Sequence, residues 1–568
     1  MSYRTSLAGG AALGVVLALN SGFTAEAATH HKRHHAPVAA KPDRTAELQA
    51  EIDELKAEVQ SLKSSGESQA AGQAQNDAQL AQMRAQLADA DARAQAAQAK
   101  VDAQIETIPG EIHTEVAKAA PKTDKLYIKG VSLQFGGFTA LETLYRSKAE
   151  QADMGSSYSA IPFGNVVAGH TSETRFSARQ SRVSALVQAN VSDTVKISGY
   201  GEFDFLGAAQ TANSNESNSY QPRIRNLYTT IDWKEGTGTF HFLGGQSWSL
   251  VTMYSSGLSP RSENIPATIE AQYVPGFVWD RQPQIRLSFD SDQHFWFGVS
   301  AESPATTYYA SGKYLPGITL INTATGGSQF NNANQYSFNR LPDFVAKAAV
   351  DEDLDGHKLH AEVFGLYRDF YARVDDSGAY GNESTSGGGV GGGFVVGVIP
   401  GWLDLQASGL WGRGIGRYGS AQLPDVTVAP DGTLHPINEW EALVGGTLHI
   451  GKQLDIYVYA GEEREQAMPL NSVSPLVFSG VGNVEYANGG CDTEGSSTCV
   501  GNTHYVGQVT AGFWHRPYVS TWGKFQWGIQ YSYTERAGFT GQGPTAGTFL
   551  TPLTHENMVF TSFRFYPF

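Results

Sequence analysis

Apolar and polar residues alternate with a period of two along much of the chain beyond residue 125. In the segment 195–205, Val195, Ile197 and Phe203 alternate with polar residues such as Lys196 and Glu202. The segment 282–290 repeats this pattern. Successive side chains of a strand point to opposite faces of a sheet. We therefore predict strands with one apolar face, directed to lipid, and one polar face, directed to a lumen.

The last stretch, residues 554–568, is unusually aromatic for a strand. Met558, Phe560 and Arg564 share one parity, and Phe563 and Phe565 share the other. Such a strand at an open sheet edge in water would invite aggregation. It fits a sheet that closes on itself with one face in lipid. The alternative is an edge strand of a soluble β-sandwich.

About sixteen candidate strands follow one another, and their connections alternate in length. The candidate strands are 126–147, 173–191, 194–210, 220–234, 238–250, 279–290, 293–303, 342–352, 356–374, 385–400, 401–416, 436–451, 452–466, 502–516, 520–537 and 553–568. The long connections, rich in Gly, Ser, Asn and Pro, are 148–172, 211–219, 251–278, 304–341, 375–384, 417–435, 467–501 and 538–552. Only short turns separate the other pairs.

This alternation is typical of outer-membrane barrels, which have short periplasmic turns, long extracellular loops and an even number of strands. A soluble sandwich has no reason for strict alternation. We predict an all-β transmembrane barrel of about 16 antiparallel strands over residues 126–568, in the bacterial outer membrane. Sixteen strands leave a water-filled lumen.

The first residues are typical of an exported protein. Residues 1–28 combine Arg4, a short apolar run and the Ala25-Glu-Ala27 cleavage pattern of a signal peptide. Residues 29–42 form a linker that contains the tract His30 to His35. Such tracts bind metals, but a solvated basic tail is the simpler interpretation, and we predict no metal site.

Residues 43–108 carry the spacing of an α-helical coiled coil. Its apolar seam steps by four and three residues through Leu48, Ile52, Leu55, Val59 and Leu62, and then through Leu80, Met83, Leu87, Ala90, Ala94, Ala97 and Val101. This spacing predicts association of helices, here a periplasmic stalk that precedes the barrel. Residues 109–125 are a second linker.

Composition narrows the function. The chain has 568 residues, 41% hydrophobic, and a formal net charge of −16. Its mean hydropathy of −0.29 excludes a bundle of membrane helices, and its pI of about 5.4 argues against nucleic-acid binding. Cys491 and Cys499 predict a small loop disulfide formed outside the cytoplasm. No cofactor is expected, because the glycine run 387–393 lacks phosphate-loop spacing.

Arginine sets stand beside a long connection that could narrow the lumen. The candidate constriction is residues 251–278, with Arg261 and Glu263. The arginine sets are Arg175, Arg179 and Arg182, then Arg223 and Arg225, then Arg281 and Arg286. Guanidinium groups match carboxylates and stay charged, so a lined constriction would favour anions. The alternative is that these arginines pair with acids or lipid headgroups at the rims. Parity leaves this open, because Arg225 shares the parity of Leu227 and Ile231.

Several segments resemble one family. The segments Ser-Ala-Arg179-Gln-Ser-Arg182, Gly244-Gly-Gln-Ser-Trp248 and Asp280-Arg-Gln-Pro-Gln-Ile-Arg286, with the coiled coil and the barrel, are similar to the DcaP-like outer-membrane porins. The resemblance implies a homotrimer, a periplasmic coiled coil and diffusion of small anionic compounds such as dicarboxylates. It also implies roles in substrate binding for Arg179, Arg182, Arg281 and Arg286. The loop segment 257–264, with Arg261, is a less secure match.

We therefore expect a diffusion porin, in contact with outer-membrane lipids, that favours small anionic solutes. Two alternatives stay open: a general non-selective porin, and an envelope tether whose coiled coil contacts the cell wall. An outer-membrane enzyme is not expected, because no Ser–His–acid set and no nucleophile elbow stand out.

Overall fold

The computed structural model describes residues 53, 56, 60, 82–95, 125–207, 221–309, 313–325 and 335–568. The chain divides into two compact units, residues 1–121 and 122–568. In the first unit, residues 82–95 are helical, and Met83 and Leu87 of the predicted seam are exposed. The signal peptide, the His30 to His35 tract and most of the predicted coiled coil lie outside the described residues. None of the described helices has the length and apolarity required to cross a membrane.

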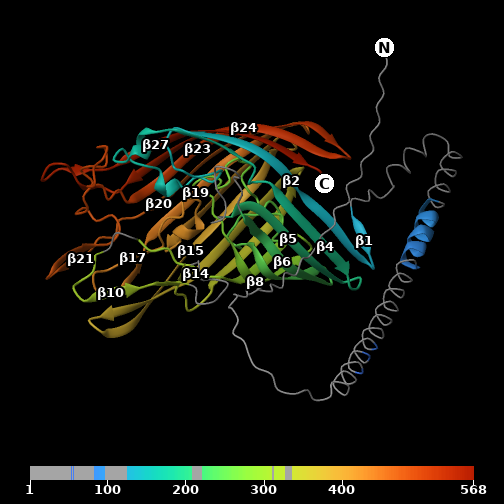
Figure 1. The fold of residues 1–568 in the computed structure, drawn as a ribbon, viewed down its shortest axis with the longest axis horizontal. Helices are drawn as coiled ribbons and strands as arrows, with labels where there is room; N and C mark the ends of the chain where they lie inside the picture. Colours follow the sequence, from blue (N-terminus) through green and yellow to red (C-terminus); the bar gives the residue numbers. More distant parts are fainter. Residues whose placement is uncertain are drawn as a thin grey trace, which may run out of the picture. The chain divides into compact units, whose positions relative to one another are not determined.

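Sixteen antiparallel strands form the second unit (Figure 1). In order around the sheet they are β2 (Val131–Arg146), β4 (Arg182–Asn190), β5 (Val195–Gly207), β6 (Gln221–Glu235), β7 (Gly238–Trp248), β8 (Arg281–Ser291), β9 (Phe295–Glu302), β13 (Asp343–Leu354), β14 (His357–Asp376), β15 (Ala379–Ile399), β16 (Leu403–Arg413), β19 (Asn438–Ile450), β20 (Leu454–Glu465), β23 (Thr503–Ser520), β24 (Gly523–Gly538) and β27 (Leu553–Tyr566). Each pairs with its neighbours in this list, and β3 (Glu173–Ser177) continues the β4 side of β2.

The sheet closes on itself. Strand β27 pairs with β2 from Thr139–Phe565 to Arg146–Met558, and the hydroxyl groups of Thr143 and Thr561 lie 2.7 Å apart across this seam. Closure gives every barrel strand two hydrogen-bonded neighbours, which is the condition for a sheet to exist in lipid. The predicted barrel of 16 antiparallel strands is confirmed.

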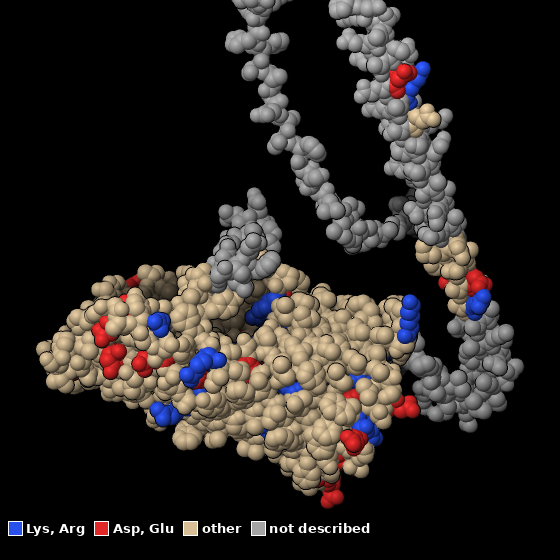
Figure 2. Space-filling view, turned by 90° about the horizontal axis from the view of Figure 1, so that it is seen from below, with Lys and Arg blue, Asp and Glu red and all other residues tan. Residues whose placement is uncertain are grey.

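The two faces of the strands divide as the alternation predicted. On β8, Ile285 and Leu287 are exposed on the outer face, whereas Gln284, Arg286 and Asp290 are buried inside. The visible outer face of the barrel carries few charged side chains (Figure 2). Tryptophans are divided between the two faces: Trp402, Trp411 and Trp522 are exposed, but Trp248, Trp279, Trp296 and Trp514 are buried.

One predicted long connection is instead a tight hairpin. Residues 375–384 were expected to form a loop, but β14 and β15 are 20 and 21 residues long and meet at a two-residue turn, Ser377–Gly378. Both turn residues have positive φ, 53° and 93°, as a tight hairpin turn requires. The strands extend this far because the short β10 (Ile318–Ile321) pairs with the end of β14. Polar composition alone did not distinguish an extended hairpin from a loop.

Glycines on the inner face of β15 make room for aromatic side chains. A Cβ atom at Gly391 would lie 2.3 Å from the Phe364 ring and 2.6 Å from the Gly409 carbonyl oxygen. Phe364 and Phe370 are both buried against this strand. The glycine run 387–393 therefore serves close packing, as expected for glycine in a strand.

We expect Gly391→Val to destabilise the barrel by about 1–3 kcal/mol, because the added side chain must displace Phe364 or the β16 backbone. The free energy of unfolding, measured in urea after refolding into lipid vesicles, checks this. Gly199→Val is the matched control, since nothing lies within 4 Å of a Cβ atom at Gly199. Equal stabilities of the two variants would contradict the packing role.

Candidate functional site

The connection of residues 249–280, between β7 and β8, folds into the lumen; we call it the inner loop. Its backbone and side chains reach strands on widely separated parts of the wall. The Leu250 amide donates to Glu302 of β9 at 2.9 Å, and the Ile269 amide donates to Gln530 of β24, on the opposite side of the barrel, at 2.6 Å. A segment that touches both strands must cross the barrel interior. The expectation that residues 251–278 turn inward is therefore correct.

Backbone amides of the inner loop are held by side-chain acceptors from the wall. These pairs are Leu250 with Glu302 at 2.9 Å, Tyr254 with Glu362 at 3.2 Å, Gly257 with Asp351 at 2.8 Å, Ile269 with Gln530 at 2.6 Å and Gly276 with Glu463 at 2.8 Å. A buried amide without an acceptor is costly. The wall acids that make these bonds therefore fix the path of the loop.

Arg286 is part of this anchorage. Its side chain is 2% exposed. Its NH1 donates to the Tyr254 hydroxyl at 2.5 Å, its NH2 to the Trp248 carbonyl at 2.5 Å, and its Nε to Gln284 Oε1 at 3.0 Å. These bonds direct the guanidinium toward the base of the inner loop. The resemblance gave Arg286 a role in binding substrate, but its contacts in the structure are those of a structural residue.

An apolar core fills the space between the inner loop and part of the wall. Ile269, Tyr273 and Phe277 of the loop pack with buried side chains of the wall, including Tyr457 and Phe560. The inward face of the aromatic strand β27 therefore packs against this loop. The lumen is consequently narrowed by packed side chains, and the loop has little freedom to swing away.

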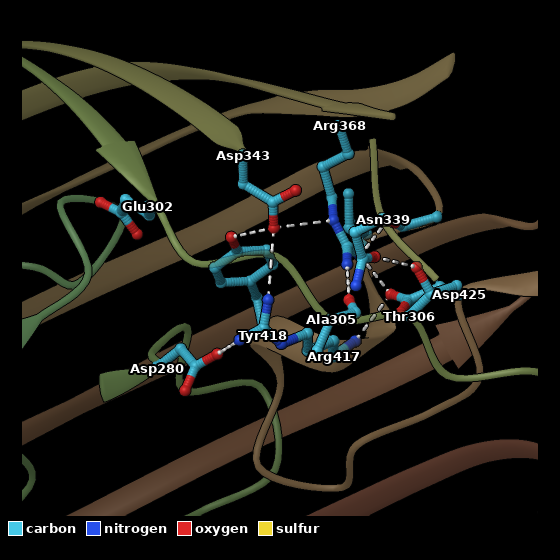
Figure 3. Close-up of polar contacts among 12 residues, drawn as sticks. Asp280, Glu302, Ala305, Thr306, Asn339, Asp343, Arg368, Arg417, Tyr418 and Asp425 are labelled. Carbon is cyan, nitrogen blue, oxygen red and sulfur yellow. Dashed lines mark hydrogen bonds and ion pairs between the residues drawn. The ribbon is translucent and has the colours of Figure 1, made fainter. Parts of the chain in front are cut away.

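A further connection is tied to the wall by a buried ionic network (Figure 3). Arg368 of β14 donates to Asp343 at 3.2 Å and also pairs with Asp425. Arg417 contacts Asp280 at 2.6 Å and Asp343 at 3.3 Å. These bonds hold the connection 414–437 against β13 and β14. They also occupy the carboxylate of Asp280, next to Arg281 in the chain.

Two neighbouring cavities lie beside the inner loop and share Arg182, Arg225, Ile265 and Tyr273; we call them together the basic compartment. The first has a volume of about 290 Å³, and Arg516, Lys524 and Arg564 also line it. The second has a volume of about 230 Å³, and Arg261 and Glu263 also line it. Cations from β4, β6, β23, β24 and β27 thus meet opposite one loop.

Arg281 and Arg182 are two guanidinium groups of this region that no ion pair joins to an acid among the described residues. Arg281 lies against Trp248 and Trp279, with its Cζ 5.0 and 5.3 Å from the ring centroids. Its Nε and NH1 are buried and donate to no acceptor among the described residues. The Nε of Arg182 is also buried and has no hydrogen-bond acceptor. The Cζ of Arg182 lies 5.3 Å from the centroid of the Phe138 ring.

The nearby acids are occupied by other arginines. Arg225 bonds Glu202 at 2.7 Å and Asp204 at 3.0 Å, and Arg223 bonds Asp204 at 2.7 Å. Glu142 is bonded by Arg564 at 2.7 Å. No ion pair joins Arg182 or Arg281 to an acid in the described part of the chain. Arg182, which lines the basic compartment, and Arg281, which lies against its lining residue Trp248, therefore have no ion-paired acid.

Arg225 enters the lumen although its parity is that of the lipid-facing residues. The register between β5 and β6 shifts at this point, from Glu202–Asn226 to Phe203–Ile224. The shift leaves Arg225 as the extra residue of a β-bulge, which moves its side chain to the other face. A parity argument carried through the bulge is wrong by one residue.

The remaining predicted residues occupy different places. Arg179 pairs with Asp153 and donates from Nε to the Phe205 carbonyl at 3.0 Å, which ties down the segment between β3 and β4. Arg261 is exposed on the inner loop, with its Cζ 5.5 Å from the centroid of the Tyr200 ring. The structure thus brings Arg182, Arg261 and Arg281 close to the basic compartment, whereas Arg179 and Arg286 stabilise loops.

Arg564, Arg516 and Lys524 were not predicted. Arg564 has the lumen parity of Met558 and Phe560 on the last strand, so the alternation itself could have identified it. Arg516 and Lys524 stand beside a short turn, where a charged residue is usually solvated, and only the closed barrel brings them near Arg182.

A larger cavity, of about 970 Å³, lies on the other side of the inner loop and is lined by Asp351, His360, Asp404 and His449 among others. No group of three or more His, Cys, Asp or Glu side chains in the described ranges is arranged to hold a metal ion. Elsewhere, Cys491 and Cys499 form a disulfide in the connection between β20 and β23.

Burial changes the protonation of an acid on the inner loop. Burial raises the pKa of Glu263 to about 7, partly opposed by backbone hydrogen bonds and by the charge of Arg286. Glu263 lines the basic compartment. Its charge therefore changes near neutral pH, and the compartment is more positive below pH 7 than above it.

A closed sixteen-stranded antiparallel barrel with an inward loop and a charged lumen is the fold of the porin class. Comparison with solved structures supports this. The outer-membrane channel DcaP of Acinetobacter baumannii superposes with a TM-score of 0.51 at 17% identity, covering 78% of this chain and 99% of that chain. The predicted DcaP-like porin fold is confirmed.

Other solved porins are more distant. OmpF of Salmonella typhi matches with a TM-score of 0.41 at 9% identity, covering 78% of this chain and 99% of that chain. An anion-selective porin from Comamonas acidovorans matches with a TM-score of 0.38 at 8% identity, covering 77% and 99%. No family model and no curated protein sequence matches the chain.

We expect Arg286→Met to destabilise the barrel by about 3 kcal/mol, because it leaves the buried Trp248 carbonyl and Tyr254 hydroxyl without their donor. Urea unfolding in lipid vesicles measures this. Arg175→Met is the control, since Arg175 is 40% exposed and pairs only with Glu173, and such a pair contributes about 1 kcal/mol or less. Similar losses in both variants would contradict the anchoring role.

Proposed function

We propose that the protein is a diffusion porin of the bacterial outer membrane that favours small anionic solutes, such as dicarboxylates. The observation that carries the proposal is the pair of uncompensated guanidinium groups, Arg182 and Arg281, beside the narrowed lumen. Guanidinium groups present paired donors that match a carboxylate. A charged solute in such a lumen is steered by their field.

The route of an anion follows from the cations that remain available. Arg281 is held between Trp248 and Trp279, so its charge is positioned without an acid. Arg261 is exposed on the loop above Tyr200. Together with Arg182, these groups form a path of donors along which a carboxylate exchanges partners. The acids of the opposite wall are engaged by loop amides, which reduces their competing attraction for cations.

We expect Arg182→Gln combined with Arg281→Gln to lower the anion-to-cation permeability ratio about tenfold at low salt. The zero-current potential of the purified protein in a planar bilayer under a salt gradient measures this ratio. Arg175→Gln should leave it unchanged. A cation-selective wild type, or a ratio indifferent to the double substitution, would contradict the anion preference and leave a general porin. A folded barrel that never conducts would contradict the porin itself.

The charge of Glu263 predicts a pH dependence of selectivity. Because its pKa is raised to about 7 by burial, the side chain is neutral at pH 5 and ionised at pH 9. We expect the anion preference to fall as pH rises through about 7, and the fall to be smaller in Glu263→Gln. Zero-current potentials between pH 5 and pH 9 check this. An identical pH profile in the variant would exclude Glu263 as the cause.

We also propose an oligomeric state, which rests on the predicted coiled coil and on the family resemblance. A homotrimer, with the coiled coil of residues 43–108 in the periplasm, fits the seam spacing and the resemblance to DcaP-like porins. Contact of this stalk with the cell wall would add a tethering role. Deletion of residues 43–108 separates the roles: loss of envelope integrity with unchanged conductance would favour the tether.

A further inference from the structure

Among the residues that the structure describes, a histidine is held between two carboxylates at three places on the lumen wall. The pairs of contacts are His241 with Asp232 at 2.8 Å and Asp290 at 3.0 Å, His360 with Asp351 at 2.8 Å and Glu362 at 3.1 Å, and His449 with Asp455 at 2.8 Å and Asp404 at 3.2 Å. An imidazole ring can donate from both nitrogens only when it is doubly protonated. This geometry therefore belongs to the imidazolium cation.

His360 differs from the other two because its carboxylates also hold the inner loop. Asp351 Oδ2 accepts from the Gly257 amide at 2.8 Å. Glu362 Oε2 accepts from the Tyr254 amide at 3.2 Å. Among the described residues, the acids beside His241 and His449 make no hydrogen bond to the inner loop; Asp290 accepts from the Gln293 amide, and Asp455 pairs with Arg516. His360 alone among the three thus connects protonation to the anchorage of the loop.

The other charged groups around His360 complete its setting. Lys347 of β13 donates to Glu362 Oε1 at 2.6 Å and to the Thr252 carbonyl at 2.8 Å. From the short turn between β8 and β9, His294 contacts the Asp351 carbonyl at 2.6 Å and Glu352 at 3.7 Å. The neighbour of His360 on β15 is the uncharged Val395.

The larger of the lumen cavities described above, which His360 and His449 both line, gives His360 a path to water. It is lined by His360, Asp351, Asp353, Lys358 and, from β16, Asp404. Arg261 and Glu263, the first charged residues of the loop that follow Gly257 in the sequence, line the basic compartment instead. A proton leaving His360 can therefore pass to water in a cavity of about 970 Å³.

We propose that His360 is a proton-dependent latch of the inner loop. The charged ring donates to Asp351 and Glu362 at once and keeps both acids turned toward the amides of Gly257 and Tyr254. When the ring loses one proton to water, one nitrogen becomes an acceptor that faces a carboxylate oxygen. That carboxylate turns away, its loop amide loses its acceptor, and residues 254–257 loosen as pH rises.

Amide hydrogen exchange of the full chain in lipid vesicles, between pH 5 and pH 9, tests the latch without requiring conduction. After correction for the intrinsic pH dependence of exchange, we expect protection of residues 254–257 to fall about tenfold across this range. In His360→Gln, whose side chain does not titrate, the pH dependence of this protection should be lost. In the control His449→Gln, which removes a histidine lining the same cavity, the wild-type pH dependence should persist.

Unchanged protection across pH in the wild-type protein would overturn the latch, as would loss of the pH dependence in His449→Gln. The pH series of the wild-type protein tests the latch by itself, so the test does not depend on whether a variant folds. Channel recordings give the functional consequence, which rests on the proposed porin function. If exchange follows pH and the current does not, the latch stands and the inner loop is not the constriction.

Discussion

The need of the inner loop for hydrogen-bond acceptors shapes the whole lumen. A buried amide left unpaired costs about 1–3 kcal/mol, and the loop crosses a barrel whose wall amides are already paired within the sheet. Wall acids such as Glu302, Glu362 and Glu463 supply the acceptors. Many lumen carboxylates are therefore structural, and the acidity of the sequence, a net charge of −16, is a poor guide to the charge that a solute meets.

Competition for carboxylates also explains why two arginines have no acid partner. Asp280 is adjacent to Arg281 but is bonded by Arg417, and Glu202 is bonded by Arg225. Arg281 and Arg182 are left without acids because other guanidinium groups already occupy the nearby carboxylates. Aromatic rings replace the missing acids: they hold a flat cation in place and leave its donors unused. A local excess of positive charge thus arises in an acidic protein.

The barrel could be predicted from the sequence because alternation within strands and between connections is local. The candidate site could not, because its residues meet only through pairings across the closed sheet. Arg286 has the residue type and the lumen-facing parity expected of a solute-binding residue, but it bonds Tyr254 and the Trp248 carbonyl at the base of the loop. Arg225 has the wrong apparent face, because a one-residue bulge reverses it. Neither distinction is visible without the register of the neighbouring strand and the path of the loop.

Closure of the barrel also constrains how it can assemble. Thr143 and Thr561 meet across the β2–β27 seam although 418 residues separate them along the chain. Bringing the ends of a flexible chain of this length together costs about 5 kcal/mol in chain entropy, so consecutive strands pair first and this seam is the last ladder to form. Until then, every partly built sheet has two free edges that can pair with another chain. The step that needs protection during biogenesis is therefore the final zipping of this seam, when both edges disappear together.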